Sequence, residues 1–380
     1  MHFDFTEDQK LIQQTAKEFA QEEIAPTAIE RDKNAEYPAE IVAKLGDLGF
    51  MGMMVSPEYG GSGMDTMSYV LAMEEISKVD ASVGVIMSVN NSLVTYGMER
   101  YGSEALKQKY LTPLAQGKKL GAFCLSEPEA GSDATSQKTE AVKVNGHWEV
   151  TGSKNWITNG KSADYYLVMA QTDRSKGHKG ITTFLIEKGW EGFTQGVKED
   201  KLGIRSSDTC SLHFTRTPVP DENIVWDVGK GFNFAMDTLN GGRIGIAAQA
   251  LGIAAASLDA AIGYSKQRKA FGQYIKDFQA IQFKIADMAT KLEVARLLTY
   301  RAAQLKDSNQ KYVKEAAMAK LYASRTAVEN ALDAIQIHGG YGYVREYLVE
   351  RYLRDAKITE IYEGTSEVQH IVIARELLKD

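Results

Sequence analysis

Cysteine and histidine are scarce in this sequence. It has two cysteines, Cys124 and Cys210, and six histidines among 380 residues. Two thiols without a CxxC pair cannot form a disulfide framework or a cysteine-rich zinc site. The histidines are scattered along the chain, so we expect no metal centre. The low cysteine content favours a reducing compartment, and we interpret the protein as cytoplasmic.

Long uninterrupted apolar runs are also missing. The most apolar stretch, residues 244–262, is rich in Ala and Gly and is interrupted by Gln249, Ser257 and Asp259. This pattern predicts a closely packed buried helix and no membrane span. Residues 1–8 are acidic and have no apolar core, so they do not predict a signal peptide. The net charge of −6 comes without a basic patch, which argues against a nucleic-acid partner.

Three motifs of other enzyme classes are absent. No GxGxxG fingerprint is present, and no βαβ alternation could hold one. Gly160-Lys161-Ser162 resembles the end of a P-loop, but Asn155 stands where the first glycine is required. A GxSxG nucleophile elbow is missing too. A flavin or nucleotide would therefore need a different cradle.

The chain divides into three zones. Residues 1–121 have helical periodicity, with a capping box at Thr6-Glu7-Asp8-Gln9. Residues 122–230 contain β-rich runs and an Asn145-Gly146 hairpin signal, which predicts an antiparallel β domain. Residues 231–380 are helical again and predict a four-helix-bundle-like domain. One long helix there carries an apolar stripe in steps of three and four, formed by Phe278, Ile281, Ile285, Met288, Leu292, Ala295 and Thr299. The fold class is thus α+β.

Two segments are difficult to explain as packing alone. Residues 123–133 place hydroxyl groups and glycine in a loop at the start of the β zone, where backbone N–H groups can meet a polar ligand. Residues 361–367 place Glu363 beside Gly364, which lets a ligand approach the backbone closely. Without further context, Glu363 would be interpreted as an ordinary surface carboxylate.

Together these segments resemble the acyl-CoA dehydrogenase family. The resemblance covers the whole chain and is closest to the short-chain (butyryl-CoA) members around residues 240–245 and 357–369. The matching strings occur in the family's order: residues 125–133, 156–160, 268–272, 336–340 and 354–365. The resemblance implies the α–β–α fold of that family, an FAD cofactor and oxidation of an acyl-CoA thioester.

By this resemblance Glu363 is the catalytic base that removes the α-proton of the thioester. Its backbone N–H and a flavin ribityl hydroxyl hold the thioester carbonyl, and the β-hydrogen passes as hydride to the flavin. Electron-transferring flavoprotein is the expected acceptor. We expect an apolar, closed pocket to raise the pKa of Glu363 toward the working pH when the substrate binds, since burial disfavours the carboxylate.

The same resemblance implies the cofactor and substrate contacts. The residues expected along the flavin and its diphosphate are Phe123, Leu125, Ser126, Ser132, Trp156, Ile157, Thr158, Thr365 and Glu367, the last through its main chain. Those expected to reach the FAD of a neighbouring subunit are Arg268, Phe271, Gln279, Gln336, Gly339 and Gly340. The expected substrate contacts are Ser132, Asn240, Arg243 and Gly364, with Arg243 near the adenine and 3′-phosphate of CoA. A monomer could then not complete its own site, and the resemblance to the family implies a homotetramer.

Gly242 bears on which residue is the base. Some relatives carry the catalytic glutamate at the matching position, and a glycine cannot act as a base, so Glu363 holds that role here. A glycine there is also consistent with close helix packing alone. The candidate pocket residues are apolar or generic, and a pocket for about four carbons is an analogy to the family; they are Met87, Val89, Asn90, Leu93 and Tyr362.

Other functions stay open at this point. Isobutyryl-CoA, 2-methylbutyryl-CoA or an enoyl-CoA in the reductive direction are alternative substrates. The same fold also serves an oxygen-reactive acyl-CoA oxidase or flavin monooxygenase, although we do not expect the extra C-terminal domain of acyl-CoA oxidases here. A non-enzymatic helical scaffold or acyl-CoA-binding module is the third alternative.

Overall fold

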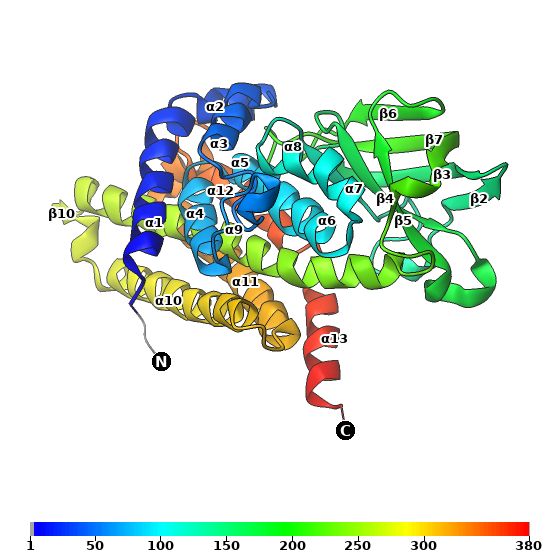
Figure 1. The fold of residues 1–380 in the computed structure, drawn as a ribbon. Coiled ribbons are helices and arrows are strands. Elements are labelled where there is room, and N and C mark those ends of the chain that lie inside the picture. Colours follow the sequence, from blue (N-terminus) through cyan, green and yellow to red (C-terminus); the bar gives the residue numbers. More distant parts are fainter. Residues whose placement is uncertain (1–3, 380) are drawn as a thin grey trace.

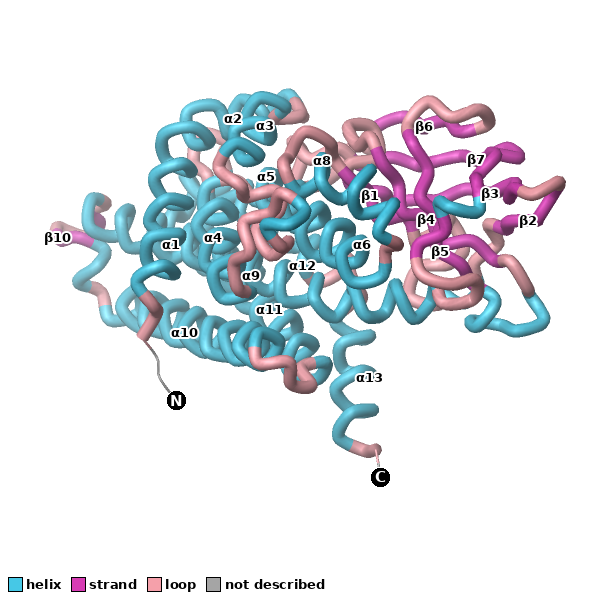
Figure 2. Tube along the Cα trace, viewed as in Figure 1, coloured by secondary structure: helices cyan, strands magenta, loops and turns pink. Residues whose placement is uncertain are grey.

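The computed structural model describes residues 4–379 and has three regions in chain order, helical, β and helical (Figure 1). The first three residues of the acidic N-terminal segment lie outside the described part. The main sheet lies at one end of the molecule, and helices make up the rest, as Figure 2 shows. The expected succession of helices, sheet and helix bundle is confirmed.

Short helices build the N-terminal region. They are α1 (Glu7–Phe19), α2 (Ala25–Asn34), α3 (Ala39–Asp47), α4 (Thr66–Val79), α5 (Ala81–Ser88), α6 (Tyr96–Tyr101), α7 (Glu104–Leu106) and α8 (Thr112–Ala115), with a π-helical segment at Val89–Thr95. The predicted capping box is confirmed at α1. Thr6 Oγ1 accepts from the Gln9 N–H at 3.2 Å, and Gln9 Oε1 accepts from the Thr6 N–H at 3.0 Å. Two backbone donors that the helix leaves free are thereby satisfied.

The middle region is a single sheet with strand order β6-β7-β3-β2-β4-β5-β8. The strands are β1 (Gly121–Cys124), β2 (Glu140–Val144), β3 (His147–Thr158), β4 (Tyr165–Gln171), β5 (Ile181–Glu187), β6 (Phe193–Lys198), β7 (Thr209–Pro220) and β8 (Ile224–Val225). The Asn145-Gly146 hairpin is confirmed, since Val144 pairs with His147 across the turn. Asn145 and Gly146 both have positive φ, 47° and 87°, as a two-residue hairpin turn requires.

The sheet is mixed, whereas a wholly antiparallel one was expected. β1 pairs parallel with β4 along its length, and β2 meets β4 parallel at Glu140 and Gln171. The β2–β3 hairpin separates β1 from β4 in the chain. Hairpin signals report only the pairing of consecutive strands, so the sequence pattern could not reveal this crossover.

Long helices form the C-terminal region. They are α9 (Gly231–Gln267), α10 (Gln279–Asp307), α11 (Val313–His338), α12 (Val349–Thr359) and α13 (Ser366–Leu377), with a small ribbon of β9 (Lys269–Ala270) and β10 (Gln273–Tyr274) after α9. The apolar stripe of α10 is confirmed, because Met288, Leu292, Ala295 and Thr299 are buried.

Helix α9 runs from beside the sheet through the centre of the helical bundle (Figure 1). By length and composition it could cross a membrane, but 83% of its most apolar window is buried inside the protein. Small residues let neighbouring backbones approach: a Cβ at Gly252 would lie 2.5 Å from the Glu74 carbonyl oxygen of α4. The expectation of a closely packed buried helix is confirmed.

Helix α13 leaves the body of the bundle and carries the described C-terminal end (Figures 1 and 2). It buries only Gln369 and Val372. Ile371 is 65% exposed and Leu378, just after the helix, 82% exposed. This apolar surface has no cover within the described chain.

Candidate active site

Glu363 lies in a tight reversal between α12 and α13. Glu363 and Gly364, hereafter the site turn, have φ values of 54° and 92°, both in the left-handed region. The Ser366 N–H donates to the Glu360 carbonyl at 3.0 Å and closes the reversal. Left-handed backbone is strained for a glutamate and persists only where its surroundings impose it. Such strain is a reason to look for function here.

The carboxyl group of Glu363 is directed into the interior against α9. A Cβ placed on Gly242 would lie 2.1 Å from Glu363 Oε2 and 2.8 Å from Leu93 Cδ2. The glycine therefore provides the space that the carboxylate occupies, in addition to any role in helix packing. Within the described residues, Oε2 is buried and has no hydrogen-bond partner. A buried oxygen without a partner is rare and marks a place where a ligand is expected.

Two cations act on this carboxylate. Burial raises the pKa of Glu363 to about 7, while the charges of Lys320 and then Arg243 oppose the rise. Lys320 of α11 donates to the Gly364 carbonyl at 2.6 Å. Arg243 of α9 donates to Asn240 Oδ1 at 2.7 Å and is 5% exposed. Arg243 is thus a buried neighbour of the carboxylate, whereas it was expected at the adenine end of CoA.

Further polar side chains, from α4, α5, α9 and the turn after α12, lie around the Glu363 carboxylate. Tyr362 donates to Gln249 Oε1 of α9, and Gln249 Nε2 donates to the Ala81 carbonyl at 2.7 Å. Tyr69 of α4 donates to Ser88 Oγ at 3.1 Å. Tyr362 was among the expected pocket residues, whereas Lys320, Gln249, Tyr69 and Ser88 were missed from the sequence. The sequence pattern did not mark Tyr69 and Ser88 as site residues, because they occur in ordinary helical segments. Gln249 was noted only because it interrupts an apolar run.

The expected pocket residues divide into two kinds. Met87, Val89 and Leu93 are buried apolar residues of α5 and the π-helical segment. Asn90, in contrast, has a structural role: its Nδ2 donates to the Met51 carbonyl at 2.8 Å, and its Oδ1 accepts from the Gly121 N–H at 3.0 Å. It ties the helical region to β1 and has no amide atom left to line a pocket.

The loop after β1 is fastened to β3 by a buried lysine. Lys154 Nζ donates to the Leu125 carbonyl at 3.1 Å, to Glu127 Oε1 at 2.7 Å and to Gln137 Oε1 at 2.9 Å. The Asn155 N–H donates to the Ser126 carbonyl at 2.9 Å. The loop residues expected to contact the flavin are therefore held against the strand that carries the next expected group, Trp156 to Thr158.

Trp156 stands out in β3. Its φ is 61° and its side chain is 62% exposed, although large aromatic residues are usually buried. The register of β3 against β7 shifts between Lys154 and Ile157, so the strand bulges at this point. The bulge turns the indole outward while Ile157 stays buried. Bulges are often found where a strand re-aims a side chain at a functional site.

The residues that were expected to reach the FAD of a neighbouring subunit lie at the other end of the helical bundle. Arg268 lines a separate cavity of about 570 Å³ together with Gly339 and Gly340. Its guanidinium lies 5.5 Å from the centre of the Tyr341 ring. Phe271, beside the β9–β10 ribbon, is 96% exposed. Gln279 and Gln336 are also exposed. Figure 1 places this ribbon far from the sheet, so one chain does not bring the two groups together.

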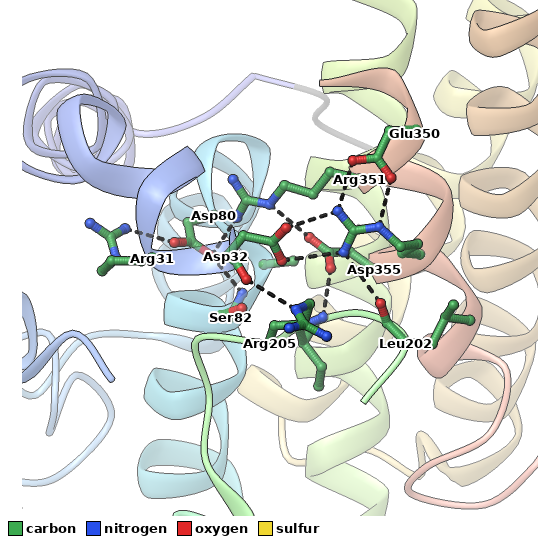
Figure 3. A network of polar contacts seen from close by, with 12 residues as sticks. Arg31, Asp32, Asp80, Ser82, Leu202, Arg205, Glu350, Arg351 and Asp355 are labelled. Atoms are coloured by element: carbon green, nitrogen blue, oxygen red, sulfur yellow. Dashed lines mark hydrogen bonds and ion pairs between the residues drawn. The ribbon is translucent and has the colours of Figure 1, made fainter. Parts of the chain in front are cut away.

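A buried ion-pair network holds α12, the helix that precedes the site turn (Figure 3). The Asp80 carboxylate accepts from Arg31 and from Arg351, at 2.7 Å each. Arg351 also pairs with Asp355 at 3.3 Å, and Asp355 accepts from the Ile204 N–H at 2.6 Å. The network joins α2, the start of α5 and the loop before β7 to α12, and so fixes the direction from which the base candidate enters the site.

Comparison with known proteins assigns the whole chain to one family. Models of the N-terminal, middle and C-terminal domains of acyl-CoA dehydrogenase match residues 6–118, 122–217 and 229–378. The short-chain-specific acyl-CoA dehydrogenase of Clostridium acetobutylicum is 50% identical, with 100% of both chains covered. Butyryl-CoA dehydrogenase from Megasphaera elsdenii has a TM-score of 0.98 at 48% identity, and a chain in a structure of the electron transferring flavoprotein of Acidaminococcus fermentans has 0.99 at 52%, both over 100% of each chain. The chain belongs to the acyl-CoA dehydrogenase family of FAD-dependent oxidoreductases.

Proposed function

We propose that this enzyme oxidises a short-chain acyl-CoA, with butyryl-CoA as the expected substrate, to the trans-2-enoyl-CoA, and that Glu363 is the base. The observation that carries the proposal is the Glu363 carboxyl group, whose Oε2 is buried without a partner in the described chain and whose pKa is raised to about 7. A base acts best when its pKa lies near the working pH. The relatives named as short-chain or butyryl-CoA dehydrogenases support the substrate class.

The residues of the site turn supply two parts of the reaction. The Glu363 carboxylate takes the α-proton, and the electron pair of that C–H bond moves toward the thioester carbonyl. The Glu363 backbone N–H makes no hydrogen bond within residues 4–379, so it is free to donate to that oxygen as negative charge develops. Bound FAD would supply the acceptor for the β-hydrogen, which leaves as hydride while the electron pair from the α-carbon forms the C2–C3 double bond. Gly242 has no side chain and so leaves the space that the Glu363 carboxylate occupies.

The chain's residues fit an FAD that is shared between subunits. The loop at residues 125–126 and the exposed Trp156 form one contact group, and Arg268 with Gly339 and Gly340 forms the other. A Cβ on Gly339 or Gly340 would meet no atom within 4 Å, so a ligand can approach the backbone there. Because the two groups are far apart in one chain, each would serve a different FAD molecule, in a homotetramer.

The other expected contacts are part of the same proposal. Thr365 caps α13 by accepting from the Val368 N–H at 3.4 Å, directly after the site turn, and Glu367 follows in the first helical turn. Ser132 is exposed and Asn240 half-buried, as substrate contacts require. The buried position of Arg243 supports a contact near the thioester instead of the adenine. The domain boundaries that we propose, 1–121, 122–230 and 231–380, fall where β1 and α9 begin.

We further propose that electron-transferring flavoprotein accepts the electrons and that the enzyme is cytoplasmic. The similar chain in the structure of an electron transferring flavoprotein supports the acceptor. The two cysteines are buried and unpaired, which agrees with a reducing compartment.

Anaerobic bleaching of the flavin by a series of acyl-CoA thioesters tests the proposal. We expect bleaching to be fastest with the four-carbon thioester. Glu363→Gln should keep bound FAD and lose bleaching, because an amide cannot accept the α-proton. Glu360→Gln removes a carboxylate three residues earlier that pairs with Lys357, and it should bleach like the wild type. Bleaching at the normal rate by Glu363→Gln would remove Glu363 from its role. Rapid reoxidation by air would instead favour an oxidase.

A further inference from the structure

Lys320 occupies an unusual position for a lysine. It lies in the middle of α11 and is 1% exposed, yet no carboxylate oxygen of residues 4–379 lies within ion-pair distance of its Nζ. Its hydrogen bond goes to a backbone carbonyl, that of Gly364, at 2.6 Å. Lysine is almost never fully buried unless it is paired. A methionine would fill the same volume at a lower desolvation cost, so the ammonium group needs an explanation.

The bonded carbonyl belongs to the site turn. Gly364 O also accepts from Gln369 Nε2 of α13 at 2.7 Å, so two side chains from two helices hold one carbonyl group. The turn consists of two consecutive left-handed residues, one of which is Glu363 itself. Strained backbone of this kind persists when the surrounding structure over-determines it. The lysine thereby fixes the orientation from which the carboxylate reaches Gly242.

The charge of Lys320 acts on the same carboxylate. It is the stronger of the two cationic influences that lower the pKa of Glu363 against the effect of burial, ahead of Arg243. In return, Glu363 favours the charged form of Lys320, whose pKa is lowered to about 8, mainly by burial and to a smaller extent by the charge of Arg243. Other titratable groups lie around Glu363 and Lys320. They are Tyr69 of α4, Tyr362 immediately before Glu363, Glu360 near Lys320, and Arg375 near Arg243.

We propose that Lys320 is a positioning residue for the base, which holds the site turn through the Gly364 carbonyl and supplies the positive charge that lets the buried Glu363 carboxyl group ionise. This inference rests on the proposed role of Glu363. An uncharged donor would supply only the first function, and an exposed lysine would supply neither.

Lys320→Met tests both functions, because methionine has a similar shape but neither charge nor donor. We expect the acidic limb of the kcat/KM profile to move to higher pH by about one unit or more, the size that an opposite nearby charge produces. At pH 7 a shift of one unit lowers the ionised fraction of Glu363, and hence kcat/KM, about fivefold. Most of the loss should be recovered at pH 9. A purely structural defect would lower the rate by the same factor at every pH.

Three variants complete the design. Lys320→Gln keeps a polar group in the buried position in case the methionine variant does not fold, and it should show the same direction of shift. Lys320→Arg retains the charge and should restore the wild-type limb. Lys284→Met is the matched control: Lys284 pairs with Asp333 between α10 and α11, so its loss weakens helix packing without changing the charge at the site turn.

A direct titration separates this inference from the proposed function. The carboxyl stretch of Glu363, obtained as the infrared difference between each protein and its Glu363→Gln counterpart, reports ionisation without turnover. An unchanged midpoint in both Lys320→Met and Lys320→Gln would overturn the role of Lys320, whatever the substrate is. A shifted midpoint in an enzyme that oxidises no acyl-CoA would uphold it and refute the proposed function.

Discussion

The raised pKa of Glu363 makes the base a source of instability at neutral pH. Its ordinary pKa of 4.5 is raised to about 7 in the folded protein. The folded state therefore binds the proton more tightly than the unfolded state. The stabilisation by this proton is fully present below pH 4.5 and is lost as the pH rises through 7. Glutamine carries no such dependence, so Glu363→Gln should gain stability relative to the wild type as the pH rises.

The size of this effect follows from the shift. One pKa unit corresponds to about 1.4 kcal/mol, so the free-energy difference between Glu363→Gln and the wild type should change by about 2.5 kcal/mol between pH 5 and pH 8. For a chain of this length that change corresponds to about 3 °C in the midpoint of thermal unfolding.

Thermal unfolding of both proteins with excess FAD, at several pH values, measures the effect. The gap between the two midpoints should widen steadily in favour of the glutamine variant from pH 5 to pH 8. Glu360→Gln, treated in the same way, corrects for the general loss of a carboxylate. A gap between Glu363→Gln and the wild type that stays constant with pH would show that the carboxyl group is not perturbed in the folded protein, and the reasoning about the base would be wrong.

Three further substitutions test the surroundings of the site. Gly242→Ala places a Cβ 2.1 Å from Glu363 Oε2, so kcat/KM should fall about 100-fold while FAD stays bound; normal turnover would contradict the close approach. Asp80→Asn leaves two buried guanidinium groups without their shared carboxylate and should lower the free energy of unfolding by about 3–5 kcal/mol, measured by chemical denaturation. A change below about 1 kcal/mol would mean that the network does not hold α12. Lys154→Met leaves Glu127 buried without its cation and loosens the loop after β1, so flavin fluorescence should show faster FAD release on dilution; retention equal to wild type would exclude this role.

Local features were predictable from the sequence because their physics involves neighbouring residues. The Thr6–Gln9 capping box and the Asn145-Gly146 hairpin each depend on groups within a few positions of one another. The apolar stripe of α10 follows from helical periodicity in the same way. The order of short motifs predicted the family and singled out Glu363. That signal is one of resemblance, since a glutamate beside a glycine has by itself no chemistry that distinguishes it from a surface residue.

Only the tertiary structure decided the environment of that glutamate. Gly242, Lys320 and Glu363 belong to different helices or turns, and nothing in their local sequence predicts that they meet. The parallel pairing of β1 with β4 has the same origin, because it joins strands that a hairpin separates. The sequence alone determined the elements and the family, through short-range patterns. The fold decided the pKa of the base and the charges that act on it, because desolvation and Coulomb interactions depend on distances in space and not along the chain.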